Sequence, residues 1–172
     1  MGNNTNTKSY VMHPRYGDKP IASDFSFSNE EIERAHWRYG SVKFFENTAI
    51  PANIEKQEVA DFPREIYVDI EEQCEVCKRP FLFFALEQKY WFETLGFWID
   101  SHCTRCMDCR LDDREIRRMQ KRYQELVNKE GRTDDEAKEL KQAALELYMR
   151  GYIKDKNKID KIKLSRCDGL GE

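Results

Sequence analysis

The amino-acid sequence predicts an α+β protein in which a small module with a β-hairpin is followed by a C-terminal helical hairpin. Three observations lead to this prediction. Two groups of closely spaced cysteines lie between Cys74 and Cys109. A strand-like alternation precedes the first group, and a helical period of apolar residues begins after Leu111. The expected parts are an N-terminal arm with a short helix wrapping the module (1–65), the module itself (66–110), and a helical hairpin with a basic tail (111–172).

The N-terminal part is predicted to hold one short helix. Ser28 and Glu31 have the spacing of a capping box, in which each side chain accepts a hydrogen bond from the other residue's backbone. We expect this helix to run to about Tyr39 and to end at Gly40. Pro51 and Pro63 bracket a segment that we expect to be irregular and not helical.

The module should be a hairpin followed by a helix. The run 66–70 places β-branched residues on one parity, so it is predicted to be a strand that leads into the first cysteine pair. Residues 81–84 form the returning strand, and a helix follows over 85–95 before Gly96. The aromatic residues here could stack on nucleic-acid bases. We favour a core role, because a small module needs large side chains to build its interior.

The C-terminal part is predicted to be a pair of antiparallel helices. The first should begin near Leu111 and end near Gly131, and Thr133 with Glu136 forms a second capping-box spacing that opens the next helix, which should end at Gly151. Both segments carry one apolar face, so the two faces should pack together. These apolar residues are Ile116, Met119, Tyr123, Leu126 and Val127 in the first helix, and Ala137, Leu140, Ala144, Leu147 and Tyr148 in the second.

The cysteine spacing predicts a metal site. Each Cys-x-x-Cys turn aims two thiolates at one point, and two such turns can surround one tetrahedral ion. We therefore expect a single structural Zn²⁺ held by Cys74, Cys77, Cys106 and Cys109. A rubredoxin-like iron site would use the same ligands, and the spacing does not separate the two metals.

Cys103 is an alternative ligand, because Cys103 and Cys106 also have the Cys-x-x-Cys spacing. We favour Cys106 with Cys109, since the segment after them begins a helix, whose N-terminus stabilises negative charge. Cys103 is then a spare thiol, an exchangeable ligand or a structural neighbour. His102 could replace a thiolate, but among so many cysteines it is interpreted as a bystander. Cys167 is remote and is interpreted as a free thiol.

Further residues of the module follow a recognisable order. After the first cysteine pair come Arg79-Pro80-Phe81-Leu82-Phe83-Phe84, Glu87-Gln88, Tyr90-Trp91-Phe92, Gly96-Phe97 and finally Arg110 behind the last cysteine. Over residues 70 to 110 this pattern resembles the "probable zinc-ribbon domain" proteins of bacteria, a family whose biochemical role is largely unassigned. The resemblance implies a zinc ribbon, and its arginine after the last cysteine supports pairing Cys106 with Cys109. Because this second pair leads into a helix, the module is expected to be zinc-ribbon-like or treble-clef-like. The sequence departs from shorter members by the additional Cys103, which keeps Cys103 as the alternative ligand.

The composition argues against several classes of function. The net charge is −3 and 35% of the residues are charged, so a modest core with much solvated surface is expected. No apolar run is long enough to cross a bilayer, and the polar start lacks a secretory signal, so a cytoplasmic protein is predicted. The three histidines have no hydrolase spacing, and neither a phosphate-binding glycine loop nor a nucleophile elbow occurs. We predict no enzymatic activity and no small-molecule substrate.

A row of basic residues follows the last cysteine and suggests a partner. Most of these residues recur at steps of three and four, so they share one helix face that could contact the phosphates of RNA or DNA. The row comprises Arg110, Arg114, Arg117, Arg118, Lys121 and Arg122. The expected function is a zinc-binding adaptor that contacts nucleic acid or a protein. The alternatives are a pure protein-interaction module and a thiol-based or zinc-based redox sensor in which Cys103 displaces a ligand.

Overall fold

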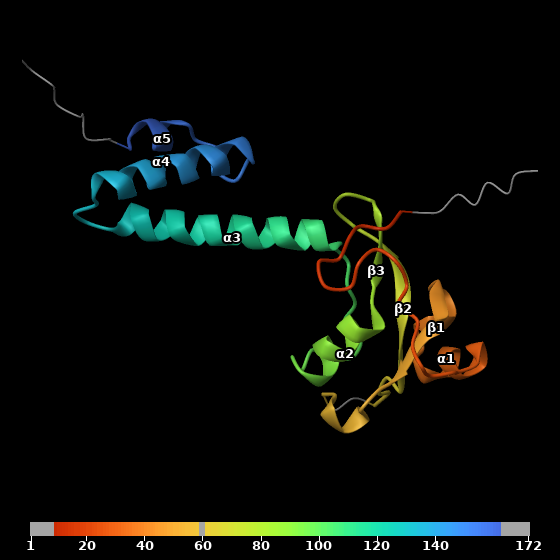
Figure 1. Ribbon diagram of the computed structural model, residues 1–172. Helices are drawn as coiled ribbons and strands as arrows, with labels where there is room; N and C mark the ends of the chain where they lie inside the picture. The colour runs from red at the N-terminus through yellow and green to blue at the C-terminus, as the bar shows by residue number, and fades with distance from the viewer. Residues whose placement is uncertain (1–8, 59–60, 163–172) are drawn as a thin grey trace, which may run out of the picture. The chain divides into compact units, whose positions relative to one another are not determined.

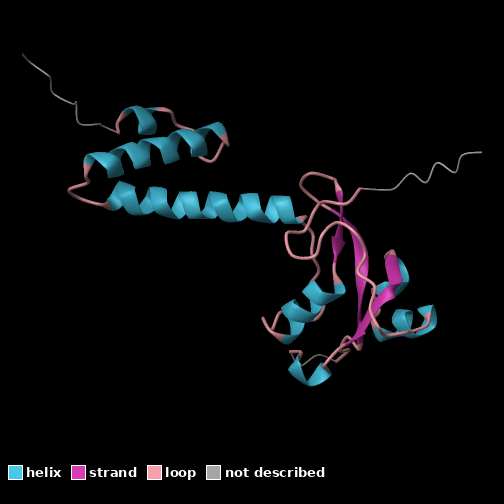
Figure 2. Cartoon of the chain, in the orientation of Figure 1, coloured by secondary structure: helices cyan, strands magenta, loops and turns pink. Residues whose placement is uncertain are grey.

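The chain folds into two units, Met1–Arg110 and Leu111–Glu172, which are described separately. The computed structural model describes residues 9–58 and 61–162. Figure 1 shows a small sheet with helices in the first unit and helices alone in the second, and Figure 2 gives the same view by secondary structure. Cys167 and the end of the predicted basic tail lie outside the described residues.

The sheet of the first unit has three antiparallel strands in the order β1-β2-β3. The strands are β1 (Phe44–Pro51), β2 (Ile66–Gln73) and β3 (Pro80–Phe83). The predicted hairpin is the β2–β3 pair, with Ile70 opposite Phe83 and Gln73 opposite Pro80. β1 was not predicted, since its pairing with β2 is interrupted between Phe45 and Ile50 and its sequence lacks regular alternation.

The central strand β2 is buried on both faces, because a helix covers each side of the sheet (Figure 1). On one face Val68 and Ile70 pack with residues of α1 (Asn29–Ala35). On the other face Tyr67 packs with Phe92 of α2 (Ala85–Glu93), and their rings lie 5.9 Å apart. Alternate side chains of β2 therefore point into two different small cores, and neither face of the strand is turned to solvent.

The helix α1 is shorter than predicted. Its capping box at Ser28 and Glu31 is present, but the helix ends at Ala35 and His36 is extended, with φ −164°. The chain then turns into the 3₁₀ helix η1 (Tyr39–Ser41), and the buried Tyr39 hydroxyl donates to the Ile66 carbonyl over 2.7 Å. These tertiary contacts outweigh the helical tendency of the segment after Ala35. A second 3₁₀ helix, η2 (Ile54–Lys56), lies in the irregular segment that the prolines predicted.

The second unit contains the predicted helical hairpin. It is formed by α3 (Met107–Asn128) and α4 (Asp134–Met149), followed by the short α5 (Asn157–Asp160). The capping box at Thr133 and Glu136 is present. Among the described residues of this unit, the buried apolar ones are Ile116, Leu126, Ala137, Leu140, Ala144, Leu147 and Ile159. α3 starts four residues before the predicted Leu111, so its first turn belongs to the first unit.

Candidate metal centre

The first cysteine pair lies in the turn of the β2–β3 hairpin. Cys74 follows the last residue of β2, and its backbone N–H donates to the Arg79 carbonyl over 3.0 Å. The Lys78 N–H donates to the Cys74 carbonyl over 2.9 Å, which closes the turn around the two sulfurs. Lys78 has φ +60°, the left-handed conformation that brings the chain back into β3. The strand register therefore fixes the positions of Cys74 and Cys77.

The second pair lies at the start of α3. The Arg110 N–H donates to the Cys106 carbonyl over 3.0 Å as the first helical bond, and Cys109 lies within the first turn. A further bond joins the two cysteine turns, since the Glu75 N–H donates to the Thr104 carbonyl over 2.9 Å. The N-terminus of a helix stabilises negative charge, but burial outweighs this and raises the pKa of both Cys106 and Cys109. This second pair therefore loses its protons to the metal that it binds.

The four predicted ligands come together in space. The sulfurs of Cys74, Cys77, Cys106 and Cys109 all lie within 4.8 Å of one another, and those of Cys77 and Cys106 are 3.6 Å apart. A tetrahedral ion with Zn–S bonds of about 2.3 Å places its sulfurs about 3.8 Å apart. The spacing of these sulfurs thus fits one structural Zn²⁺ with four thiolate ligands.

Hydrogen bonds to the sulfurs of the first pair stabilise the thiolate form of both cysteines. Burial alone would raise the pKa of Cys74, but backbone N–H groups of Val76, Cys77 and Cys106 point at its sulfur and lower the pKa to about 6. The pKa of Cys77 is also lowered, because the backbone N–H and the side chain of Arg79 donate to its sulfur. A thiolate is the form that binds zinc, so these donors favour metal binding.

Arg79 links the two cysteine turns. Its Nε donates to the Cys77 sulfur over 3.4 Å, and its terminal nitrogen pairs with Asp108 of α3 over 2.8 Å. Four thiolates around Zn²⁺ carry a net charge of −2, which a neighbouring guanidinium offsets. The sequence analysis gave Arg79 no role, although its position directly after the first pair was the available signal.

Cys103 lies beside the cluster but is not part of it. Its side chain is buried, and its thiol donates to the Arg105 carbonyl over 3.1 Å. Burial raises the pKa of Cys103 to about 12, so this residue remains a thiol. His102 is exposed.

Aromatic residues of the hairpin build the core around the cysteines. Phe81 and Phe83 pack with the buried cysteines and with Val11 of the N-terminal arm. The Val11 N–H donates to the Pro80 carbonyl over 3.0 Å, so the arm lies along β3 next to the metal centre. Trp91 of α2 contacts Phe83 with ring centres 4.9 Å apart. Phe81 and Phe83 are buried and Trp91 is half-buried, as the sequence analysis favoured, whereas Tyr90 of α2 is exposed.

The six basic residues after the cysteines do not share one environment. Arg110 is held in the first unit, where its guanidinium pairs with the buried Glu87 over 2.7 Å and lies 5.5 Å from the centre of the Trp91 ring. Arg122 pairs with Glu139 of α4 over 2.7 Å. The other four are exposed: Arg114, Arg117, Arg118 and Lys121.

Comparison with known proteins gives a family for the metal-binding part. No curated protein and no solved structure matches the chain significantly. A match to a family model begins in β2, includes both cysteine pairs and ends in α3. Residues 68–118 match the family described as "Probable treble clef domain", and with its four clustered cysteines this part of the chain is a zinc-binding treble clef domain.

Proposed function

We propose that this protein is a non-enzymatic, zinc-binding adaptor that contacts nucleic acid through the basic face of α3. The observation that carries the proposal is a stripe of four exposed cations, Arg114, Arg117, Arg118 and Lys121, hereafter the basic stripe. Steps of three and four residues place them on one side of the helix, opposite the buried Ile116.

The charge pattern of α3 supports a phosphate contact. A solvated helix face usually mixes both signs of charge. Here Asp113 and Glu115 fall on the two flanks of the basic stripe, and Glu125 ends it. Asp112 lies on the side of the buried Ile116, where it pairs with Arg150 at the end of α4. Arginine side chains bind phosphate oxygens with two parallel hydrogen bonds, so a continuous arginine-rich stripe suits a nucleic-acid backbone.

The metal centre supports a structural role for zinc. Four thiolates fill a tetrahedral site and leave no position for a water molecule or a substrate. Among the described residues, no helix is long and apolar enough to cross a membrane. The proposal places the protein in the cytoplasm, where reducing conditions keep such cysteines available to metal.

Binding measurements at several salt concentrations test the basic stripe. Fluorescence anisotropy with labelled single-stranded and duplex oligonucleotides should show binding that weakens as salt rises. The triple variant Arg114→Gln, Arg117→Gln and Lys121→Gln should bind more weakly, and the slope of log K against log salt should decrease by about 2 to 3.

A charge-matched variant is the control for this experiment. Lys19→Gln, Lys56→Gln and Lys138→Gln together remove three exposed cations outside α3. This variant should keep both the affinity and the salt slope of the unmodified protein. Equal behaviour of the two triple variants, or no binding by the unmodified protein, would remove nucleic acid as the partner and leave a protein-interaction module as the function.

The redox-sensor alternative has less support. It requires Cys103 to attack or displace a ligand, and a buried thiol with a raised pKa is a poor nucleophile. Zinc release by mild peroxide, followed with a colorimetric chelator, should therefore be the same for the unmodified protein and for Cys103→Ser. A Cys103→Ser variant that resists zinc release would favour the redox sensor instead.

A further inference from the structure

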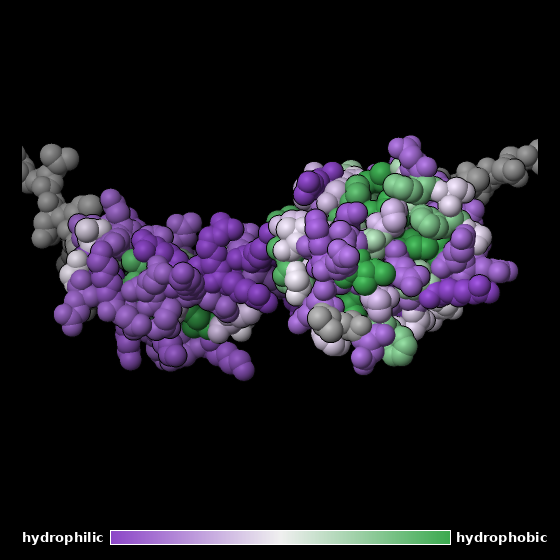
Figure 3. All heavy atoms as spheres, turned by 90° about the horizontal axis from the view of Figure 1, so that it is seen from below, coloured by the Kyte–Doolittle hydropathy of each residue, from purple (hydrophilic) through white to green (hydrophobic). Residues whose placement is uncertain are grey.

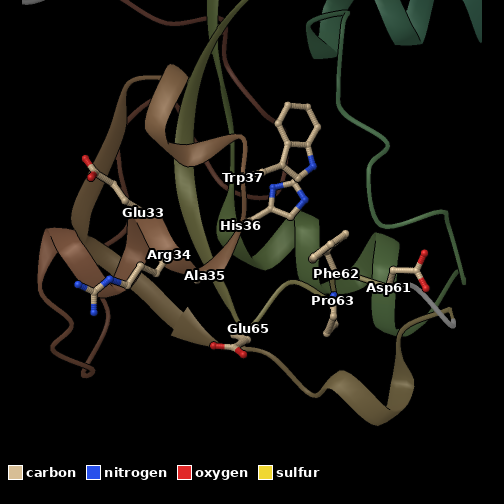
Figure 4. A pocket seen from close by; sticks show the side chains of 9 residues that line it. All are labelled: Glu33, Arg34, Ala35, His36, Trp37, Asp61, Phe62, Pro63 and Glu65. Atoms are coloured by element: carbon tan, nitrogen blue, oxygen red, sulfur yellow. The ribbon is translucent and has the colours of Figure 1, made fainter.

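A second candidate site lies in the first unit, in a pocket of about 490 Å³. It is lined by residues of the end of α1 and the turn that follows it, 33–37, and by residues of the segment before β2, 61–63 with Glu65 (Figure 4). The lining residues include none of the four clustered cysteines. The pocket is therefore separate from the metal centre and from the basic stripe.

Trp37 is an exposed ring that is held in place. Its side chain is among the most accessible of the large apolar residues, at 67% exposed. The indole N–H donates to Asp100 over 2.8 Å, and the same carboxylate oxygen lies 3.2 Å from Nε2 of His36. This bond holds the edge of the indole while its ring remains accessible. A ligand would therefore meet a preorganised aromatic surface.

A second exposed ring lies on the other segment of the pocket. Phe62 is 77% exposed, the highest value among the large apolar residues described as exposed. Figure 4 shows the Phe62 ring and Pro63 on the same side of the pocket as the rings of Trp37 and His36. In the same view His36 lies between Trp37 and Phe62, and its side chain is buried. A group of exposed apolar side chains at one place is typical of a binding surface. Figure 3 shows that other apolar residues also reach the surface of the first unit on the face drawn there.

The rim of the pocket is acidic. It contains three exposed carboxylates, Glu33, Asp61 and Glu65, and one cation, Arg34. Arg34 also lies 3.8 Å from Glu30, which offsets its charge. Nucleic acid would be repelled by this rim, whereas a cation would be attracted. Lysine and arginine side chains combine an apolar stem with a cationic end, and cations bind the faces of aromatic rings.

We propose that this pocket binds a lysine or arginine side chain from a basic peptide segment of a partner protein. The stem of the side chain packs on Trp37 and Phe62, and its cation is attracted to Asp61 and Glu65. This proposal is independent of nucleic-acid binding by α3. Together the two surfaces would let one chain join a nucleic acid and a basic protein.

Peptide titration monitored by NMR tests the ligand class. The probes are acetyl-Ala-Ala-X-Ala-Ala-amide peptides in which X is lysine, arginine, norleucine or glutamate, added to the full zinc-loaded chain. The indole ¹H–¹⁵N signal of Trp37, assigned by its loss in Trp37→Phe, should shift saturably with the lysine and arginine peptides. Equal shifts with norleucine, or no shift with any peptide, would overturn the proposal. If the Trp37 indole signal shifts when only the protein concentration is raised, with no peptide added, a second copy of the chain occupies the pocket and the peptide proposal is overturned.

Neutralising the rim tests the role of charge. The double variant Asp61→Asn and Glu65→Gln should bind the lysine peptide about two- to fivefold more weakly, because both carboxylates are exposed and contribute modestly. The control Glu46→Gln with Glu58→Gln removes two exposed carboxylates that do not line the pocket. Its affinity should be unchanged, and equal weakening in both double variants would contradict a specific acidic rim.

Removing one ring tests the aromatic contact while Trp37 remains as the reporter. Phe62→Ala should weaken binding of the lysine peptide by about two- to fivefold, because the stem of the lysine loses part of the apolar surface on which it packs. Phe25→Ala, which removes a ring that is 52% exposed outside the pocket, should leave the affinity unchanged. An unchanged affinity in Phe62→Ala would exclude this ring from the site.

Discussion

His36 is a buried histidine whose surroundings favour the neutral imidazole. Its side chain is fully buried beside Asp100. Burial, followed by the nearby charge of Arg64, lowers the pKa of His36 to about 4, although Asp100 acts in the opposite direction. Arg64 is itself completely buried; its guanidinium donates to the Ile99 carbonyl over 2.8 Å and lies 4.8 Å from the centre of the Phe92 ring. Burial, supported by a cation inside the core, thus keeps this residue of the proposed peptide pocket neutral.

The lowered pKa of His36 predicts how stability changes with pH. Above pH 6.5 the imidazole is neutral in both the folded and the unfolded chain. As the pH falls from 6.5 to 4, only the unfolded chain takes up the proton, so folding stability decreases over this window. Relative to His36→Gln, the unmodified protein should lose on the order of 3 kcal/mol of unfolding free energy between these pH values.

Urea unfolding of both proteins at a series of pH values measures this difference. Comparing them at the same pH cancels the effect of acid on the zinc ligands, which both chains share. His102→Gln, at an exposed histidine, should follow the curve of the unmodified protein. Parallel curves for the unmodified protein and His36→Gln would contradict a buried, neutral His36.

At the level of elements, a residue of β2 fixes the start of α2. The Asp69 carboxylate is buried and accepts hydrogen bonds from the Ala85 N–H over 2.7 Å and from the Ile21 N–H over 2.9 Å. α2 has no side-chain cap at Phe84, so Asp69 supplies the cap from a distant strand. Burial raises the pKa of Asp69 to about 6, while the two N–H donors act against this rise. One carboxylate therefore joins the arm, the sheet and the helix.

Asp69→Ala should destabilise the first unit by about 2 to 4 kcal/mol, since the buried Ala85 N–H and the half-buried Ile21 N–H lose their acceptor. Asp69→Asn keeps one acceptor oxygen and should have an intermediate effect. Urea unfolding gives the free energies, and hydrogen exchange should be faster at the amides of Ala85 and Ile21 in the alanine variant. Asp24→Ala, at an exposed position, is the control. An Asp69→Ala variant as stable as this control would exclude the remote cap.

Elements that local sequence determines were predictable, and those that depend on distant pairing were not. The capping boxes at Ser28 and Thr133 are present, because each involves residues only three apart. β1 was missed, since its register depends on partner residues of β2 that lie 15 to 26 positions further along the chain, and on an irregular step after Phe45. The early end of α1 likewise reflects contacts of His36 and Tyr39 with residues far along the chain.

On the scale of the whole molecule, the cysteine spacing was enough to predict a zinc module, because a short turn brings each pair together whatever surrounds it. The environment of the basic residues was not predictable in the same way. Helical periodicity grouped Arg110 with the exposed cations. The structure instead pairs Arg110 with Glu87 of α2, so its side chain is largely buried in the first unit. The pocket at Trp37 and Phe62 had no sequence signal, since its two rings come from separate segments.

The central claim is that one zinc ion, held by Cys74, Cys77, Cys106 and Cys109, organises the first unit. Elemental analysis of the full chain, purified under reducing conditions without added metal, tests it most directly. The account predicts one zinc per chain in the unmodified protein and in Cys103→Ser, and loss of the metal in Cys74→Ser and Cys109→Ser. A chain without stoichiometric zinc, or a site that survives Cys109→Ser but not Cys103→Ser, would contradict it.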